Sequence, residues 1–200
     1  MTKKTIAEAP PLAWIDRCIV DNLACIGSLR QQSDCIAAAV ELLVQTLVAG
    51  GKVLTAGNGG SAAEAMHMAE ELVGRYRGNR RSLPGIALTA DGTALTCIGN
   101  DFGFDQVFSR QIEGLGVAGD LLVLFSTSGQ AANLTLAVHA ARNRKMRILL
   151  ILGRDGGPLA GCGDCEIVVQ GLDTARIQEA HQLVLHILLE GVERAFPAQI

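Results

Sequence analysis

Hydrophobic residues in the first quarter of the chain follow the period of an α-helix. From Leu12 to about Gly50 they recur at spacings of three and four positions, as they do on one face of a helix. Polar residues at about 31–34 interrupt the pattern, and Gly50-Gly51 ends it, because glycine commonly follows the last helical turn. The pattern therefore predicts two N-terminal helices.

Beyond Gly51 the pattern changes to short apolar runs that alternate with longer helical segments. The apolar runs predict strands at 52–56, 85–89, 120–125, 147–152 and 166–170. Helices are predicted at about 60–75, 91–98, 104–114, 130–144 and 174–195. Strands that alternate with helices form right-handed crossovers and a parallel sheet covered on both faces. We therefore expect one α/β domain, a five-stranded parallel sheet within 51–200 that is preceded by a helical extension at 1–50.

The last predicted helix is apolar on nearly all sides. Apart from His186, residues 183–189 are all apolar, and such a helix is buried on more than one side. In a domain of this size we expect another subunit to cover the additional side. A matching surface is offered by the apolar residues of the N-terminal helices, which are Ile19, Leu23, Ile26, Leu29, Ile36, Val40, Leu43 and Leu47. We therefore expect a homo-oligomer with helices at its interface.

Composition and charge exclude several classes of protein. Hydrophobic residues make up 49% of the chain and charged residues 18%, which excludes a disordered chain. No apolar run approaches the ~20 residues that cross a bilayer, and the start of the chain resembles no secretory signal. The net charge of -3 gives no overall positive field for nucleic acid. We expect a soluble cytoplasmic protein with no membrane or nucleic-acid partner.

Two local clusters allow more than one interpretation. A basic cluster, formed by Arg75, Arg77, Arg80 and Arg81, is either a solvated loop or a rim that contacts an anion. Cys162 and Cys165 form a CxxC pair, which is the spacing of some redox and zinc sites. The chain has no second CxxC and no thioredoxin-like pattern around this one, so we interpret its six cysteines as reduced thiols.

Two loops that follow predicted strands combine glycine with hydroxyl residues. The first reads GNGGS at 57–61 and the second reads STSGQ at 126–130. Ligands of open parallel sheets bind beyond the carboxyl ends of strands, where free N–H groups at helix N-termini attract anions. Neither loop matches the Walker A or the GxGxxG pattern, and the alternative is two ordinary turns with N-cap serines. Together the loops favour a phosphate site.

Side chains on two predicted helices suit a metal or an acid–base pair. His67 and Glu71 lie four residues apart and share one helix face, whereas Glu70 points about 100° away. A surface hydrogen-bonded pair is the alternative for these two residues. Further partners are available on the last helix, where Gln178 shares a face with either His181 or His186. The helical period does not choose between these two histidines.

A polar pair, Asn100 and Asp101, precedes an aromatic pair in the GNDFGF segment. The pair is expected in a loop, either as a turn that caps a helix or as a carboxamide and a carboxylate that bind sugar hydroxyls.

Five spaced segments together resemble the sugar isomerase (SIS) domain family, and within it the phosphoheptose isomerases. The segments are GNGGSAAEAMHMAEELVGRYR, GNDFGFDQVFSRQIE, STSGQAANL, GRDGGPLAG and ARIQEAHQLVLHIL. The resemblance implies a flavodoxin-like sheet, one zinc ion per subunit and a homotetramer with active sites between subunits. It also implies the conversion of sedoheptulose 7-phosphate to D-glycero-D-manno-heptose 7-phosphate, on the route to the heptose of bacterial lipopolysaccharide.

The resemblance also assigns residues, position by position. The implied zinc ligands are His67, Glu71, Gln178 and His186, which selects His186 over His181. Glu71 and His186 are the expected catalytic acid–base pair. The implied substrate contacts are Asn58, Gly59, Gly60, Ser61, Glu71, Asn100, Asp101, Ser126, Thr127, Ser128 and Gln178.

Two positions depart from the family pattern. Gln130-Ala131 replaces Asn-Ser, which removes one expected phosphate hydroxyl, and Ala175 replaces an aspartate, with Asp173 two residues out of register. Two alternatives to this function remain, an isomerase of another sugar phosphate and a non-catalytic SIS adaptor that binds a replication initiator. The adaptor shares the stretch ARIQ at 175–178, but it has no chemical need for Glu71 and His186.

Overall fold

The computed structural model describes residues 12–197 and contains a five-stranded sheet. The strands are β1 (Val53–Gly57), β2 (Gly85–Ala87), β3 (Leu121–Ser126), β4 (Arg147–Gly153) and β5 (Cys165–Val169). All neighbouring strands pair in parallel, in the order β2-β1-β3-β4-β5. This is the flavodoxin-like order, so the predicted fold is confirmed.

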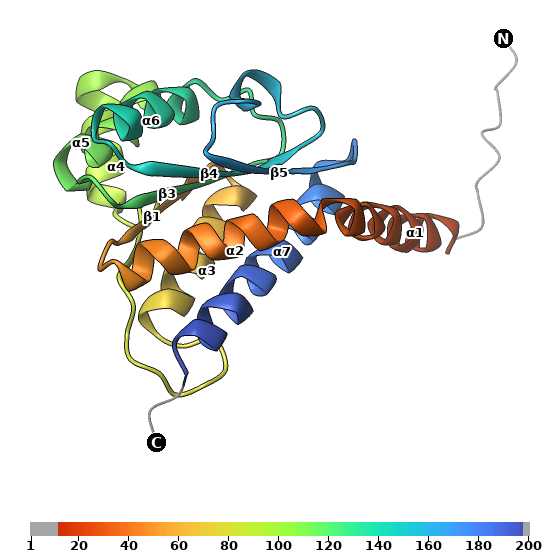
Figure 1. Ribbon diagram of the computed structural model, residues 1–200. Helices are drawn as coiled ribbons and strands as arrows, with labels where there is room; N and C mark the ends of the chain where they lie inside the picture. The colour runs from red at the N-terminus through yellow and green to blue at the C-terminus, as the bar shows by residue number, and fades with distance from the viewer. Residues whose placement is uncertain (1–11, 198–200) are drawn as a thin grey trace, which may run out of the picture.

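Helices cover both faces of the sheet. They are α1 (Ala13–Ser28), α2 (Ser33–Val48), α3 (Gly60–Val73), α4 (Gly92–Phe102), α5 (Ser109–Leu115), α6 (Ala132–Asn143) and α7 (Thr174–Ala195), with short 3-10 helices η1 (Leu29–Gln32), η2 (Phe104–Gln106) and η3 (Gly157–Leu159). Figure 1 shows α4, α5 and α6 on one face and α2, α3 and α7 on the other. The fold is therefore a three-layer α/β/α sandwich.

Strand β3 explains why the central strands read as continuous apolar runs. Leu121, Val123 and Phe125 point into the core shared with α2, α3 and α7. Leu122 and Leu124 point into the second core, shared with α5 and α6. All five side chains are fully buried, as expected for a strand covered on both faces.

The all-round apolar character of α7 has its cause within the chain. This helix packs against α1, α2 and α3, and its residues Val184, Leu185, Leu188 and Leu189 are fully buried. Helices α1 and α2 cover much of this additional side, and Ile187 is the large hydrophobic residue of α7 that stays exposed, at 37%. The homo-oligomer stays a prediction.

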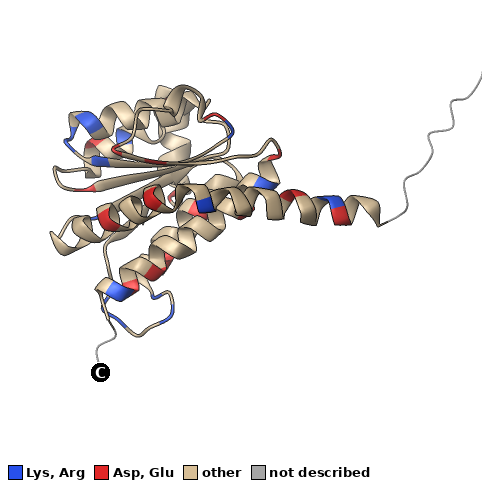
Figure 2. Cartoon of the chain, turned by 45° about the vertical axis from the view of Figure 1, so that its right-hand side comes forward, with Lys and Arg blue, Asp and Glu red and all other residues tan. Residues whose placement is uncertain are grey.

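Helix α1 extends beyond the body of the molecule and exposes apolar side chains (Figure 1). Trp14 is 67% exposed and Leu23 is 63% exposed. Figure 2 shows few charged residues on this helix, and basic and acidic residues are interspersed over the rest of the visible face. Among the described residues, no helix is both long and apolar enough to cross a membrane.

Candidate functional site

The two glycine- and serine-containing loops lie at the point where the strand order reverses. Strand β1 lies between β2 and β3, so the loops that follow β1 and β3 leave the same edge of the sheet side by side. The side-chain amides of Asn58 and Asn133 exchange two hydrogen bonds of 2.9 Å, which join the first loop to α6. This edge is the ligand-binding position of the fold class.

Backbone geometry explains the two glycines of the first loop. Gly59 has a φ of 58° and a ψ of -121°, a combination that side chains disfavour. A Cβ atom on Gly60 would lie 2.3 Å from Nε2 of Gln178, so glycine here leaves room for the Gln178 amide at the start of α3. Three predicted substrate contacts, Gly59, Gly60 and Gln178, are therefore brought together. Ser61 is buried directly behind them, at 3% exposure.

The serines of these loops are not helix caps. Helices α3 and α6 begin after Gly59 and Ala131, and neither N-terminus has a side-chain cap. In the second loop, Oγ of Ser126 instead accepts a 2.9 Å hydrogen bond from the N–H of Gly129. The capping alternative is therefore wrong, and N–H groups at both helix N-termini have no side-chain acceptor, as an anion site requires.

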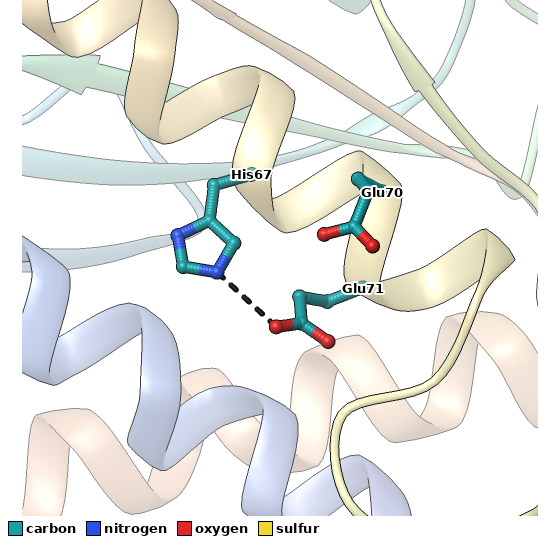
Figure 3. A group of neighbouring side chains, drawn as sticks. All are labelled: His67, Glu70 and Glu71. Carbon is teal, nitrogen blue, oxygen red and sulfur yellow. Dashed lines mark hydrogen bonds and ion pairs between the residues drawn. The ribbon is translucent and has the colours of Figure 1, made fainter.

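His67 and Glu71 pair across one turn of α3. Nε2 of His67 donates a 3.2 Å hydrogen bond to Oε1 of Glu71 (Figure 3). The expectation that Glu70 points away from this pair is wrong for its carboxylate, because one of its oxygens lies within 4.8 Å of ligand atoms of both residues. The position of Glu70 around the helix axis was inferred correctly, but its long side chain bends back toward His67 and Glu71. The three residues can hold a cation together.

Gln182 of α7 links His67 to His186. Its amide Nε2 lies 2.7 Å from Nδ1 of His67 and 3.1 Å from Nε2 of His186. Because an amide nitrogen only donates, both ring nitrogens present a lone pair to the same point. The two imidazole centroids are 5.3 Å apart. Gln182 was missed in the sequence, although it lies one turn from both Gln178 and His186.

The structure separates the two histidines that periodicity left open. His181 is fully buried, and its Nε2 donates to the carbonyl of Leu152 at 3.0 Å. Its Nδ1 lies 3.7 Å from Oε2 of Glu64, which is 5% exposed. His186 instead lies beside His67, where α7 packs on α3, and is only partly buried, so it is the histidine available for chemistry. Glu64 is a second residue that the sequence analysis missed.

The surroundings of His186 favour its neutral form. Burial lowers the pKa of His186 below its ordinary value, the nearby His67 lowers it further, and Glu71 acts in the opposite direction. A neutral imidazole can accept a proton or bind a metal ion. His186 is therefore in the form that either role requires at neutral pH.

Tyr76 and Glu193 hold one side of His186. The Tyr76 ring stacks on the His186 ring with centroids 5.5 Å apart. The Glu193 carboxylate of α7 accepts hydrogen bonds from the backbone N–H groups of Tyr76, Arg77 and Gly78. Although burial alone raises the pKa of Glu193, these N–H groups and Arg80 lower it overall. The hydrogen bonds to Glu193 therefore hold the loop that carries Tyr76 in place.

Arg80 is neither solvated nor free to contact an anion. Its side chain is 1% exposed, and its guanidinium donates to the backbone carbonyls of Glu71 and Leu72 at the end of α3. Burial lowers the pKa of Arg80. The loop interpretation therefore fits the exposed Arg75, Arg77 and Arg81, whereas Arg80 closes the end of the helix that carries the site.

The structure does not bring Asn100 and Asp101 to the other predicted contacts. Helix α4 continues to Phe102, so both residues lie in its last turn rather than in the expected loop. Nδ2 of Asn100 donates to Oδ1 of Asp101 at 2.7 Å, and both residues are exposed. Within residues 12–197, neither forms a hydrogen bond with the two loops or with the histidines.

The donor set fits zinc. Two imidazoles and a carboxylate are typical zinc ligands, and His67 and His186 direct ring nitrogens to one point, now taken by the Gln182 amide. Gln178 instead lies against Gly60, so its part in the predicted ligand set stays a prediction. Cys162 and Cys165 do not form a comparable site, because they pack in cores on opposite faces of the sheet.

Comparisons with known proteins identify the family of the chain. The SIS domain model matches residues 24–153. The chain is 48% identical to the phosphoheptose isomerase of Citrifermentans bemidjiense over 162 residues, covering 81% of this chain and 84% of that protein. It is 51% identical to the phosphoheptose isomerase of Campylobacter concisus over 159 residues, covering 79% of this chain and 84% of that protein.

Solved structures give the same result. The phosphoheptose isomerase of Neisseria gonorrhoeae has a TM-score of 0.86 at 40% identity, covering 90% of this chain and 97% of that one. The enzyme of Francisella tularensis has a TM-score of 0.87 at 33% identity, covering 93% of this chain and 100% of that one. The chain belongs to the SIS domain family and, within it, to the phosphoheptose isomerases.

Proposed function

We propose that the chain is an aldose–ketose isomerase that converts sedoheptulose 7-phosphate to D-glycero-D-manno-heptose 7-phosphate. The observation that carries the proposal is the meeting of His67, Glu71 and His186 on helices α3 and α7, where α3 begins directly at the first loop and its N-terminus lacks a side-chain cap. The relatives named above support the heptose phosphate as substrate, and the product would feed the heptose of lipopolysaccharide.

The second loop and α6 would bind the phosphate. Ser126, Thr127 and Ser128 supply hydroxyl and N–H donors, and the uncapped start of α6 adds the positive end of a helix dipole. Ser61 would contribute from the first loop. Anchoring the phosphate would hold the carbonyl end of the sugar near the acid–base side chains, and such positioning accounts for a large part of catalysis.

Glu71 and His186 would move the protons. Glu71 takes a proton from C1 of the ketose to give a cis-enediolate and returns it to C2. His186 moves the proton between the two oxygens. The pairing of the Glu71 carboxylate with His67 orients it for this step.

Zinc bound by His67, Glu71, Gln178 and His186 would stabilise, as a Lewis acid, the negative charge on the carbonyl oxygen, and Glu71 and His186 would have to leave the metal to move protons. For this site to form, the Gln182 amide would turn away from the two imidazoles. The donor chemistry and the convergent ring nitrogens support this set.

We further propose a cytoplasmic homotetramer with active sites between subunits. The exposed apolar residues of α1, among them Trp14 and Leu23, support the assembly. Asn100 and Asp101 support shared sites, because they lie apart from the other predicted contacts beside the exposed rings of Phe102 and Phe104. An exposed aromatic surface of this kind is typical of an interface.

The non-catalytic adaptor function receives no support. Glu71 and His186 are both present, and the relatives reported above carry the name of an enzyme. An isomerase of another sugar phosphate differs only in substrate, so the experiment below separates it from the proposed reaction.

The purified protein should convert sedoheptulose 7-phosphate to the aldose, followed by NMR with and without added zinc. His186→Ala should abolish conversion, whereas His139→Ala, at an exposed position on α6, should not. If the folded wild-type protein gave no conversion, sedoheptulose 7-phosphate would be excluded as its substrate. A panel of other sugar phosphates would then show whether the protein isomerises any of them.

A further inference from the structure

The GRDGG loop at 153–157 is the one motif of the resemblance that the proposed mechanism leaves without a role. It follows β4 and packs directly against the phosphate loop. A Cβ atom on Gly129 would lie only 1.8 Å from the carbonyl oxygen of Gly156, and one on Gly157 would lie 2.5 Å from the carbonyl oxygen of Ser128. Glycines at these positions let the two backbones touch, so the loops form one unit.

Arg154 of this loop has a fixed and unusual backbone. Its φ is 59°, one of two positive values at non-glycine positions in the described chain. Its N–H donates to the carbonyl of Val169 at 3.1 Å, which extends the pairing of β4 with β5. A side chain held in this sparsely populated region often serves a function.

The charge of Arg154 is not neutralised by an ion pair. Its guanidinium donates to Oγ1 of Thr174 at 3.3 Å, and none of the ion pairs formed among residues 12–197 includes it. The neighbouring Asp155 carboxylate accepts a hydrogen bond from the N–H of Gly157 at 3.1 Å. The positive charge is therefore available to a ligand.

Arg154 and the phosphate loop share one cavity of about 940 Å³. Ser128 and Gln130 line it from one side and Arg154 and Asp155 from another. Gln170, the residue directly after β5, also lines it. The exposed side chain of Arg154 therefore borders the same cavity as the phosphate loop.

The phosphate loop itself carries no cation. Its residues 126–131 read STSGQA, all neutral, and Ala131 lacks the hydroxyl that the resemblance leads one to expect. A phosphate monoester carries about -1.5 to -2 charges near pH 7. Neutral donors leave this charge without a counter-ion, and the only guanidinium lining this cavity is that of Arg154.

We propose that Arg154 is a phosphate-binding residue of this isomerase, a cation that reaches from the β4 loop to the sugar phosphate held by the second loop. The proposal rests on the proposed function for the sugar, but it assigns a charge that Ser126, Thr127 and Ser128 do not provide. It also gives the GRDGG loop a role, which is to present this side chain beside the loop it contacts.

The test compares Arg154→Gln, Arg154→Lys and the control Arg147→Gln. Arg147 is the first residue of β4, whereas Arg154 follows the last one, and the Arg147 guanidinium faces Asp164. Arg154→Gln should raise the KM for sedoheptulose 7-phosphate by about tenfold with kcat changed by less than about twofold. The inhibition constant of inorganic phosphate should rise in parallel, Arg154→Lys should retain most of the affinity, and Arg147→Gln should match the wild type.

Unchanged KM and unchanged phosphate inhibition in Arg154→Gln would overturn the proposal, as would an equal loss in Arg147→Gln. Binding of sedoheptulose 7-phosphate and of inorganic phosphate, measured by thermal shift, keeps this test apart from that of the proposed function. If the wild type binds phosphate without turnover, the proposed reaction fails, and Arg154 is still decided by whether Arg154→Gln loses that binding. The far-UV circular dichroism of Arg154→Lys and Arg154→Gln verifies that both fold.

Discussion

Two histidine–carboxylate contacts lie where α3 packs against α7, one joining the two helices and one within α3, and they differ in access to solvent. At the inner contact, His181 and Glu64 are 0% and 5% exposed. At the outer contact, the side chains of His67 and Glu71 are 33% and 16% exposed, with His186 beside them. The residue types are the same, so burial decides which contact meets a substrate and which one holds the two helices together.

The largest effect is expected from a substitution that removes the proposed base from the outer contact. Glu71→Gln keeps the shape of the side chain but removes the proposed base, so kcat should fall by about a thousandfold while sugar-phosphate binding remains. Turnover measured by NMR, with zinc content determined in the same samples, decides the outcome. Retained isomerase activity would remove Glu71 from the base role.

The next largest effect, on the free energy of unfolding, is expected from a substitution at the inner contact. Glu64→Ala removes a buried side chain that lies 3.7 Å from Nδ1 of His181 and leaves a cavity between the two helices, so the free energy of unfolding should fall by about 3 kcal/mol. The matched substitution Glu71→Ala, at the more exposed contact, should cost less than about 1 kcal/mol. Urea unfolding of both variants measures the difference, and equal costs would contradict the division of roles.

A smaller effect concerns the support of the outer contact. Because the pKa of Glu193 is lowered in the folded protein, its charged form contributes stability above the unfolded value near 4.5, and this contribution is lost as the pH falls through the folded pKa. Glu193→Gln should therefore cost about 1 kcal/mol at pH 7 and progressively less below about pH 4.5. Unfolding curves at several pH values test this, and a cost independent of pH would exclude the carboxylate charge as its source.

The smallest effect leaves both contacts intact. Asp173 caps α7 by accepting hydrogen bonds from the N–H groups of Ala175 and Arg176. Asp173→Ala should lower the free energy of unfolding by about 1 kcal/mol with kcat unchanged. A large loss of kcat would instead mean that Asp173 takes the place of the aspartate missing at position 175.

Periodicity predicted the elements because the core imposes it along each strand and helix. The strands of the sheet and the His67–Glu71 pair were found in this way, since both depend on neighbours close in sequence. Gln182, Glu64 and the Tyr76–Glu193 support were not found, because their partners lie on other elements. Helix–helix contacts of this kind depend on how α3 and α7 pack, which a one-dimensional pattern does not contain.

The last turn of α4 was missed for a similar reason. Asn100 and Asp101 are common turn residues, yet the helix continues through them to Phe102. The direction of Glu70 was misjudged because a helical wheel gives the position of Cα and not the bend of a long side chain. The helical period left the choice between His181 and His186 open, because the apolar surroundings of both residues are similar in the sequence. The family resemblance selected His186, and the burial of His181 gives the physical reason.

The paired amides of Asn58 and Asn133 have a consequence for substrate length. They tie the loop after β1 to the helix after β3, and the two strands lie only about 4.8 Å apart in the sheet. The first loop, which leads into the helix that carries Glu71, and the loop that would hold the phosphate therefore stay at a fixed separation. A sugar phosphate with too few carbons between its carbonyl and its phosphate would not reach the acid–base side chains while its phosphate is bound.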